Sequence, residues 1–169
     1  SMIRILIADD HSIFRQGLKE ILENETDLEV IKETGSGREA VSLGIAGICD
    51  VMLIDLSMPD VHGLDVLKQI KSARSDTKII ILSMYPEEHF GLRALKSGAS
   101  GYITKGCTAN ELIGAIRKIW RGGVHVSAHL SELLTNNLCN KRGSSPDEIL
   151  SDREFQVLVM LASGMRNKE

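Results

Sequence analysis

Residues 51–60 read Val-Met-Leu-Ile-Asp-Leu-Ser-Met-Pro-Asp, and this stretch decides the fold. Its first four side chains, Val51 to Ile54, are all apolar. A continuous apolar run of this length is typical of a parallel strand that is buried on both faces of its sheet. Asp55 follows at the point where the strand should end. The stretch therefore predicts a buried strand that brings a carboxylate to one edge of a sheet.

Strands and helices alternate along the chain on both sides of this stretch. Strict alternation predicts a parallel sheet with helices on both faces, and right-handed crossovers make it an α/β doubly wound sheet of five strands. The other apolar runs predict strands at 2–8, 28–34, 78–82 and 101–104, and apolar residues at helical spacing predict helices at 13–22, 37–46, 64–70, 87–96 and 110–120.

The bulk composition excludes several classes of protein. A chain of 169 residues can hold one domain with a proper core and a smaller appendage. Its net charge of −3 gives no basic field for nucleic acid or an anionic membrane. It has no apolar run of membrane-spanning length and no signal-peptide pattern, so we expect a cytoplasmic protein. Its cysteines, Cys49, Cys107 and Cys139, are widely spaced and predict free thiols.

Polar side chains stand where the predicted strands end. Asp9 and Asp10 follow the first strand, Asp55 the third, Ser83 the fourth and Lys105 the fifth. Ligands of doubly wound sheets bind at the carboxyl ends of the strands, so we expect these groups to converge. Taken singly, each has an ordinary reading as a turn, a cap or a solvated charge. Their joint position on one edge favours a functional site.

The chemistry of this set points to phosphate. Clustered carboxylates repel one another unless a cation joins them, and Mg²⁺ is the hard divalent ion that prefers oxygen ligands. An aspartate carboxylate can act as a nucleophile toward phosphorus and form an aspartyl phosphate. The ammonium of Lys105 and the hydroxyl of Ser83 would then stabilise the charge of the phosphoryl oxygens.

Residues 2 to about 122 resemble a CheY-like receiver domain. The resemblance rests on Asp9-Asp10, Asp55, Ser83, Tyr102 and Lys105, and on the loop from Asp55 to Asp60. It implies a flavodoxin-like sheet with strand order 2-1-3-4-5. It also implies that Asp55 is the phosphoacceptor of a sensor histidine kinase and that the chain is no enzyme beyond phosphorylating and dephosphorylating itself.

The same resemblance implies a role for each site residue. Asp10 and Asp55 would bind Mg²⁺, Asp9 through water, and Ser57 through its backbone carbonyl. Lys105 would pair with the phosphoryl oxygens, while Ser83 and Tyr102 would form the switch. His11 and His62 lie nearby in the sequence. They could bind a metal or act as a base, but we favour loop histidines at the rim because Mg²⁺ prefers oxygen.

The tail indicates an output domain. Residues 127–138 predict a helix, 140–146 a linker, and Ser151 with Glu154 a capping box that opens another helix. The segment 150–169 resembles the start of a LuxR-type helix-turn-helix, and the whole chain resembles the NarL/FixJ family of regulators. We therefore expect a receiver at 2–123, a linker with a helix at 124–149 and a shortened DNA-binding domain at 150–169.

This resemblance implies DNA as a partner of a longer protein and a possible homodimer formed on phosphorylation. The segment stops before the recognition helix, and its five basic and five acidic residues from Lys141 onward cancel, so we expect that this chain alone does not bind DNA. Two alternatives stay open. One is a receiver that acts only through protein contacts, which would need no tail. The other is a phosphatase, which Ser57 disfavours because such enzymes need an acid there.

Overall fold

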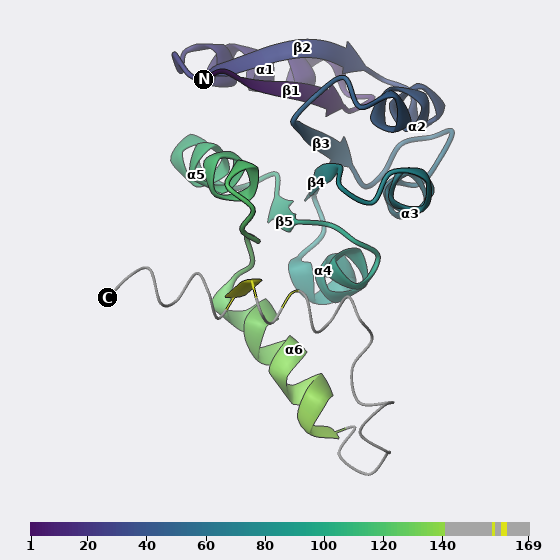
Figure 1. Cartoon of the computed structure of the whole chain (residues 1–169), viewed down its shortest axis with the longest axis vertical. Helices are drawn as coiled ribbons and strands as arrows, with labels where there is room; N and C mark the ends of the chain where they lie inside the picture. Colours follow the sequence, from purple (N-terminus) through teal and green to yellow (C-terminus); the bar gives the residue numbers. More distant parts are fainter. Residues whose placement is uncertain (141–156, 158–159, 162–169) are drawn as a thin grey trace.

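The computed structural model describes residues 1–140, 157 and 160–161 (Figure 1). Its strands are β1 (Ile3–Ala8), β2 (Leu28–Thr34), β3 (Val51–Asp55), β4 (Lys78–Ser83) and β5 (Gly101–Thr104). Its helices are α1 (Ser12–Glu23), α2 (Gly37–Ala46), α3 (Gly63–Ala73), α4 (Glu87–Lys96), α5 (Ala109–Trp120) and α6 (Ala128–Asn140). Within residues 1–140 the predicted strands and helices are all present, with ends that differ by a few residues at most.

The five strands form one parallel sheet in the order β2-β1-β3-β4-β5. This confirms the predicted doubly wound α/β fold and its strand order. β1 lies between β2 and β3, so the direction in which the sheet grows reverses between β1 and β3. In such sheets the crevice for a ligand opens outside the carboxyl ends of the two strands at this switch point. The topology therefore directs attention to the ends of β1 and β3.

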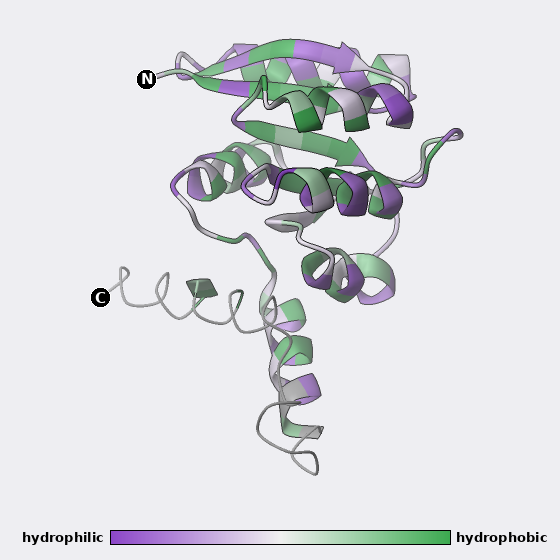
Figure 2. Cartoon of the chain, turned by 45° about the vertical axis from the view of Figure 1, so that its right-hand side comes forward, coloured by the Kyte–Doolittle hydropathy of each residue, from purple (hydrophilic) through white to green (hydrophobic). Residues whose placement is uncertain are grey.

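Helices cover both faces of the sheet. Helices α1 and α5 pack on one face, and α2, α3 and α4 pack on the other (Figure 1). In β3, Val51 and Leu53 face α1 and α5, whereas Met52 and Ile54 face the opposite layer. All four are completely buried, and each such side chain stabilises the fold by about 1.5–3 kcal/mol. Figure 2 shows β3 as hydrophobic along most of its length, in contrast to the mixed edge strand β2.

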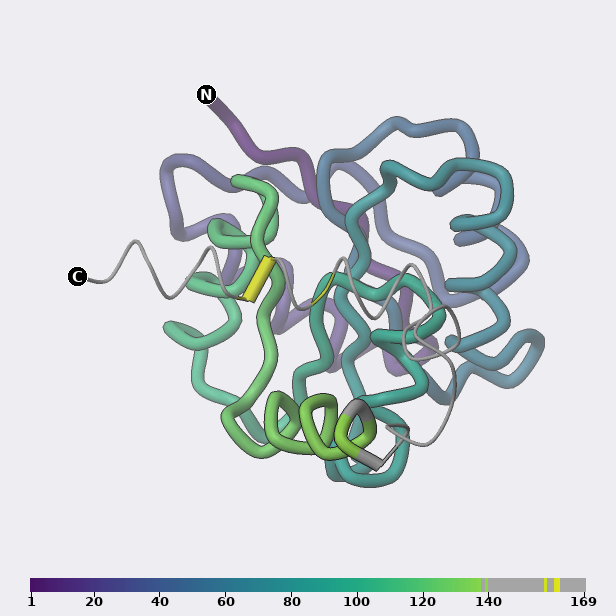
Figure 3. The backbone as a smooth tube through the Cα atoms, turned by 60° about the horizontal axis from the view of Figure 1, so that its bottom comes forward, coloured from purple at the N-terminus to yellow at the C-terminus, as the bar shows by residue number. Residues whose placement is uncertain are grey.

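Helix α6 packs against α4, on the side of the sheet that carries β5 (Figures 1 and 3). The contact has its own apolar cluster, which is formed by Leu95, Val124, Leu130, Leu134 and Val157. The predicted C-terminal helix after the receiver is thereby confirmed. Apart from residues 157 and 160–161, the linker after Asn140 and the helix expected from Ser151 lie outside the described residues.

Within the described part of the chain, no helix is both long enough and apolar enough to cross a membrane.

Candidate functional site

The side chains predicted to carry the chemistry all leave the carboxyl edge of the sheet. Asp9 and Asp10 directly follow β1, and Asp55 is the last residue of β3. Ser83 is the last residue of β4, and Lys105 directly follows β5. Parallel pairing fixes this arrangement, because strands that run in the same direction end on the same side. The site therefore lies at the switch point of the sheet and extends toward β5.

Three carboxylates gather at the end of β1 and β3. Single side-chain atoms of Asp9, Asp10, His11 and Asp55 lie within 4.8 Å of one another. Asp9 and Asp55 are almost completely buried, at 1% and 3% exposure, whereas Asp10 is more exposed. Buried acidic groups at this separation destabilise one another, so the cluster favours the binding of a cation.

Lys105 supplies part of the compensating charge. Its ammonium nitrogen lies 2.7 Å from Asp9 Oδ2 and 3.3 Å from Asp55 Oδ1. The same nitrogen lies 4.5 Å from the centre of the Phe14 ring, where a cation is attracted to the aromatic face. Because its side chain is only 6% exposed, Lys105 is held in place and is not a mobile surface lysine.

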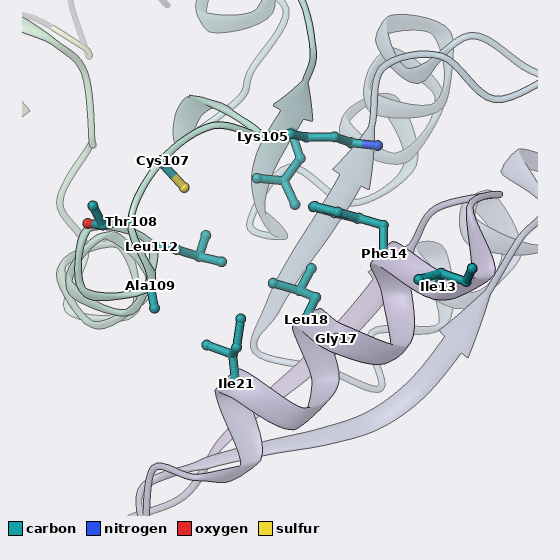
Figure 4. Close-up of a pocket in the computed structure, with 11 residues that line it drawn as sticks. Ile13, Phe14, Gly17, Leu18, Ile21, Lys105, Cys107, Thr108, Ala109 and Leu112 are labelled. Atoms are coloured by element: carbon teal, nitrogen blue, oxygen red, sulfur yellow. The ribbon is translucent and has the colours of Figure 1, made fainter.

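An apolar cleft of about 210 Å³ lies beside this lysine, between α1 and the start of α5 (Figure 4). The stem of Lys105 forms one wall, and Phe14 and Leu18 of α1 form another. Cys107 points its sulfur toward the same space. The apolar packing of the stem leaves the Lys105 ammonium directed at the carboxylates.

The surroundings of Asp55 disfavour the ionised form of its carboxyl group. Burial raises its pKa above the ordinary value, and the neighbouring charge of Asp9 raises it further. Lys105 opposes both effects and lowers it. Asp55 Oδ2 is buried and has no hydrogen-bond partner among the described residues. An unpartnered carboxylate oxygen beside two other carboxylates fits the donor set of a hard divalent ion such as Mg²⁺.

The loop after β3 folds closely around Asp55. The backbone amide of Ser57 donates to Asp55 Oδ1 at 3.4 Å, and that of Gly63 donates to the carbonyl of Leu56 at 2.7 Å. A side chain at Gly63 would place its Cβ only 2.5 Å from the carbonyl oxygen of Asp55. Glycine is therefore required at this position, because backbone atoms cannot move aside as a flexible side chain can.

Ser83 and Tyr102 make their hydrogen bonds with the loop between β4 and α4. The hydroxyl of Ser83 accepts from the backbone amide of Tyr85 at 2.9 Å. The hydroxyl of Tyr102 donates to the backbone carbonyl of Tyr85 at 2.8 Å. Both side chains are buried, and burial raises the pKa of Tyr102. The two residues predicted as a switch thus both form hydrogen bonds to Tyr85, in the loop that precedes α4.

The two histidines that lie near the site in sequence, His11 and His62, differ in their surroundings. His62 caps α3, where its Nδ1 accepts from the amide of Leu64 at 3.3 Å. His11 is largely exposed, yet its Nδ1 lies 3.2 Å from Asp9 Oδ1, 3.3 Å from Asp10 Oδ1 and 3.9 Å from Asp55 Oδ2. Its contact with all three carboxylates makes it a member of the site and not only of its rim. Its position directly after the acidic pair is the sequence signal for this.

Comparison with known proteins agrees with this geometry. Residues 5–117 match the family described as the response regulator receiver domain. The chain is 37% identical over 174 residues to the oxygen regulatory protein NreC of Staphylococcus carnosus, with 99% of the chain and 80% of NreC covered. It is 32% identical over 169 residues to the response regulator UvrY of Escherichia coli O6:H1, with 99% of the chain and 78% of UvrY covered.

A solved structure extends the likeness to three dimensions. The crystal structure of a two-component response regulator of the LuxR family from an Aurantimonas species has a TM-score of 0.72 and 29% sequence identity. The similarity covers 85% of this chain and 100% of that one. The chain therefore belongs to the two-component response regulators of the NarL/FixJ family, and residues 5–117 form its receiver domain.

Proposed function

We propose that Asp55 is the residue that accepts the phosphoryl group from a sensor histidine kinase. The observation that carries the proposal is the place of the Asp55 carboxylate, between the ammonium of Lys105 and the acidic pair at the end of β1. One oxygen of Asp55 would form a bond to phosphorus while the bond from phosphorus to the nitrogen of the donor histidine breaks. The histidine nitrogen leaves with the electron pair of that bond.

The residues around Asp55 have separate tasks in this transfer. Asp9, Asp10 and Asp55, with the backbone carbonyl of Ser57, would hold Mg²⁺. When bound, the ion supplies positive charge to the phosphoryl oxygens. Lys105 already lies within 3.3 Å of an Asp55 oxygen, so its ammonium can pair with an oxygen of the transferred group without a large movement. The same residues would allow slow phosphorylation by small donors and slow release of the phosphoryl group to water.

The output of the site would pass through Ser83 and Tyr102. If the Ser83 hydroxyl left the Tyr85 amide to bind a phosphoryl oxygen, the loop before α4 would lose one of its hydrogen bonds. Tyr102, which bonds to the carbonyl of Tyr85, would then move as well. We propose that residues 2–123 are the receiver, 124–149 a linker with a helix, and 150–169 the beginning of a DNA-binding domain. In the cytoplasm, phosphorylation would control homodimerisation and DNA binding by the longer protein, and so regulate transcription.

Phosphorylation with a small donor tests the acceptor. The wild type would be incubated with phosphoramidate and Mg²⁺, and intact-mass spectrometry should show the gain of one phosphoryl group. Asp55→Asn should show none. Asp50→Asn is a matched control, because Asp50 is also a hydrogen-bonded carboxylate but accepts from Arg4 at the opposite edge of the sheet. Phosphorylation of Asp55→Asn at the wild-type rate would overturn the assignment.

A further inference from the structure

Asp60 ties the loop after β3 to the first turn of α2. Its Oδ1 accepts from the backbone amide of Gly37 at 2.9 Å. Its Oδ2 accepts from the backbone amide of Arg38 at 3.1 Å and from the hydroxyl of Ser36 at 2.9 Å. The donors lie 22 to 24 positions earlier in the chain, so these bonds join two separate loops.

The hydrogen bonds of Asp60 are strong for a surface residue, because their acceptor is a charged carboxylate. Free amides and the positive end of the helix dipole favour an anion at the N-terminus of α2. Ser36 reinforces the arrangement, because its hydroxyl donates to Asp60 and accepts from the amide of Glu39 at 3.2 Å. The two amides and the hydroxyl together lower the pKa of Asp60 far below its ordinary value. The Asp60 carboxylate therefore stays ionised, and both of its oxygens accept hydrogen bonds.

The loop that Asp60 anchors carries Ser57. At its start, the amide of Leu56 donates to the carbonyl of Leu82 at 3.0 Å, and at its end Gly63 bonds back to Leu56. Between these points, Asp60 provides the side-chain hydrogen bonds to another element. Ser57 is exposed, and among the described residues its one hydrogen bond is the long 3.4 Å bond to Asp55 Oδ1. Met58 also holds the loop, because it is buried in the apolar cluster with Leu56. The position of the Ser57 backbone therefore depends on this packing together with the polar anchor at Asp60.

The other end of this bridge lies against the acidic pair. The loop between β2 and α2 begins at Thr34, whose carbonyl accepts from the amide of Asp9 at 2.9 Å. Gly35 follows, and a Cβ placed on it would lie 3.7 Å from the Cα of Asp10. One short loop thus contacts the segment of Asp9 and Asp10 and, two residues later, receives Asp60. The pairing of β1 with β3 already holds the two halves of the candidate metal site side by side, and the bridge adds a second connection between their loops.

We infer that Asp60 is a positioning residue, which holds the Ser57 backbone and the acidic pair at the separation that a divalent cation requires. This inference rests on the proposed function, since it concerns the Mg²⁺ site proposed there. Residues that hold metal ligands in place typically change metal affinity 10- to 100-fold when they are replaced. The alternative is that Asp60 only caps α2, in which case its loss would lower stability and leave the affinity unchanged.

Direct measurement of metal binding separates the two roles. Mn²⁺ would be titrated into the wild type, Asp60→Ala, Asp60→Asn, Ser36→Ala and the control Asp50→Ala, with free Mn²⁺ followed by electron paramagnetic resonance. Mg²⁺ would then be used to displace it. We expect Asp60→Ala to weaken binding about tenfold or more, and Asp60→Asn and Ser36→Ala to weaken it less. Asp50→Ala should bind as the wild type does, although it loses a comparable set of hydrogen bonds.

A second measurement follows phosphorylation by phosphoramidate as a function of Mg²⁺ concentration. In Asp60→Ala, the Mg²⁺ concentration at half-maximal rate should rise about tenfold, while the rate at saturating Mg²⁺ returns to near the wild-type value. Equal Mn²⁺ affinities of Asp60→Ala and Asp50→Ala would overturn the inference. Should Asp60→Ala fail to fold, the milder Asp60→Asn and Ser36→Ala decide in the same way. Absence of Mn²⁺ binding by the wild type would instead contradict the proposed function.

Discussion

Lys105 binds Asp9 more closely than it binds Asp55, with its ammonium nitrogen 2.7 Å from the first carboxylate and 3.3 Å from the second. The lysine is therefore shared and can turn toward charge that develops on the Asp55 side. We expect Lys105→Met to lower the rate of phosphorylation by a small donor by a factor of about 100 to 1,000, the usual loss for one such donor. The rate would be measured by intact-mass spectrometry under saturating Mg²⁺.

Methionine keeps the apolar stem that lines the cleft beside Phe14, so the variant should fold. Lys105→Arg serves as the control for charge. It retains the cation but spreads it over a planar fork, so we expect an intermediate rate. A rate for Lys105→Met within twofold of the wild type would show that the ammonium does not take part.

Asp55→Asn should raise the thermal stability of the protein when Mg²⁺ is removed with a chelator. Burial and the charge of Asp9 raise the pKa of Asp55 in the folded state, so its ionised form is disfavoured there. The resulting loss of folding stability begins as the pH rises past the pKa of aspartate in the unfolded chain, which is near 4. It is complete above the pKa of Asp55 in the folded state. The gain in Tm should therefore be larger at about pH 7 than at about pH 4.

Restoring Mg²⁺ gives the complementary measurement. The wild type should be stabilised in proportion to the logarithm of the free Mg²⁺ concentration, because the ion binds only the folded state. Asp55→Asn has lost one carboxylate and should respond much less. If scanning calorimetry gave both proteins the same rise in Tm with Mg²⁺ concentration, Asp55 would not be a ligand.

The three thiols should differ in reactivity. Burial raises the pKa of Cys49 to about 11, so at about pH 8 only roughly one molecule in a thousand carries the reactive thiolate there. Burial also raises the pKa of Cys107, whereas Cys139 is exposed. We expect iodoacetamide to modify Cys139 first and Cys49 last. Peptide mass spectrometry of timed samples would check the order, and early labelling of Cys49 would contradict its packing against the apolar core.

Leu130 should be the residue that holds α6 on α4. It is completely buried, and its methyl groups approach within 3.4 Å of the Cβ that an alanine would carry at Gly91. Leu130→Ala should lower the free energy of opening of α6 by about 2–5 kcal/mol. Amide hydrogen exchange along residues 128–140 would measure it. Thr135→Ala is the control, because Thr135 is exposed and, among the described residues, its side chain bonds within the helix, to Ser131.

The strands and the shared edge of the site could be predicted because they depend on short-range patterns, whereas the strand order came from the resemblance to receiver domains. The run from Val51 to Ile54 is apolar on both sides, and both sides are buried. Asp9, Asp55 and Lys105 end or follow parallel strands, so their meeting is a consequence of topology. The structure confirms that these three side chains contact one another.

Contacts between loops could not be predicted in this way. Asp60 bonds to Ser36, which is 24 positions away, and no periodicity relates the two residues. For His11, the sequence leaves a metal-ligand or base role open and favours the rim, because Mg²⁺ prefers oxygen. That preference does not indicate where the ring points. Its orientation follows from the start of α1, where the backbone amide of His11 donates to Asp9 Oδ1 at 2.8 Å. Both contacts depend on how loops meet in space.

Helix α4 contacts both the loop of the candidate site and α6, so it could couple the two in either direction. The loop before it is held at Tyr85 by Tyr102, while its flank, through Leu95, shares an apolar cluster with Leu130. Thermodynamic linkage is reciprocal. If phosphorylation changes the free energy of a rearrangement of α6, then that rearrangement changes the free energy of phosphorylation by the same amount. A ligand that favours one placement of α6 would therefore shift the phosphorylation equilibrium proposed for Asp55. Events at α6 would then influence the phosphorylation site, and not only the reverse.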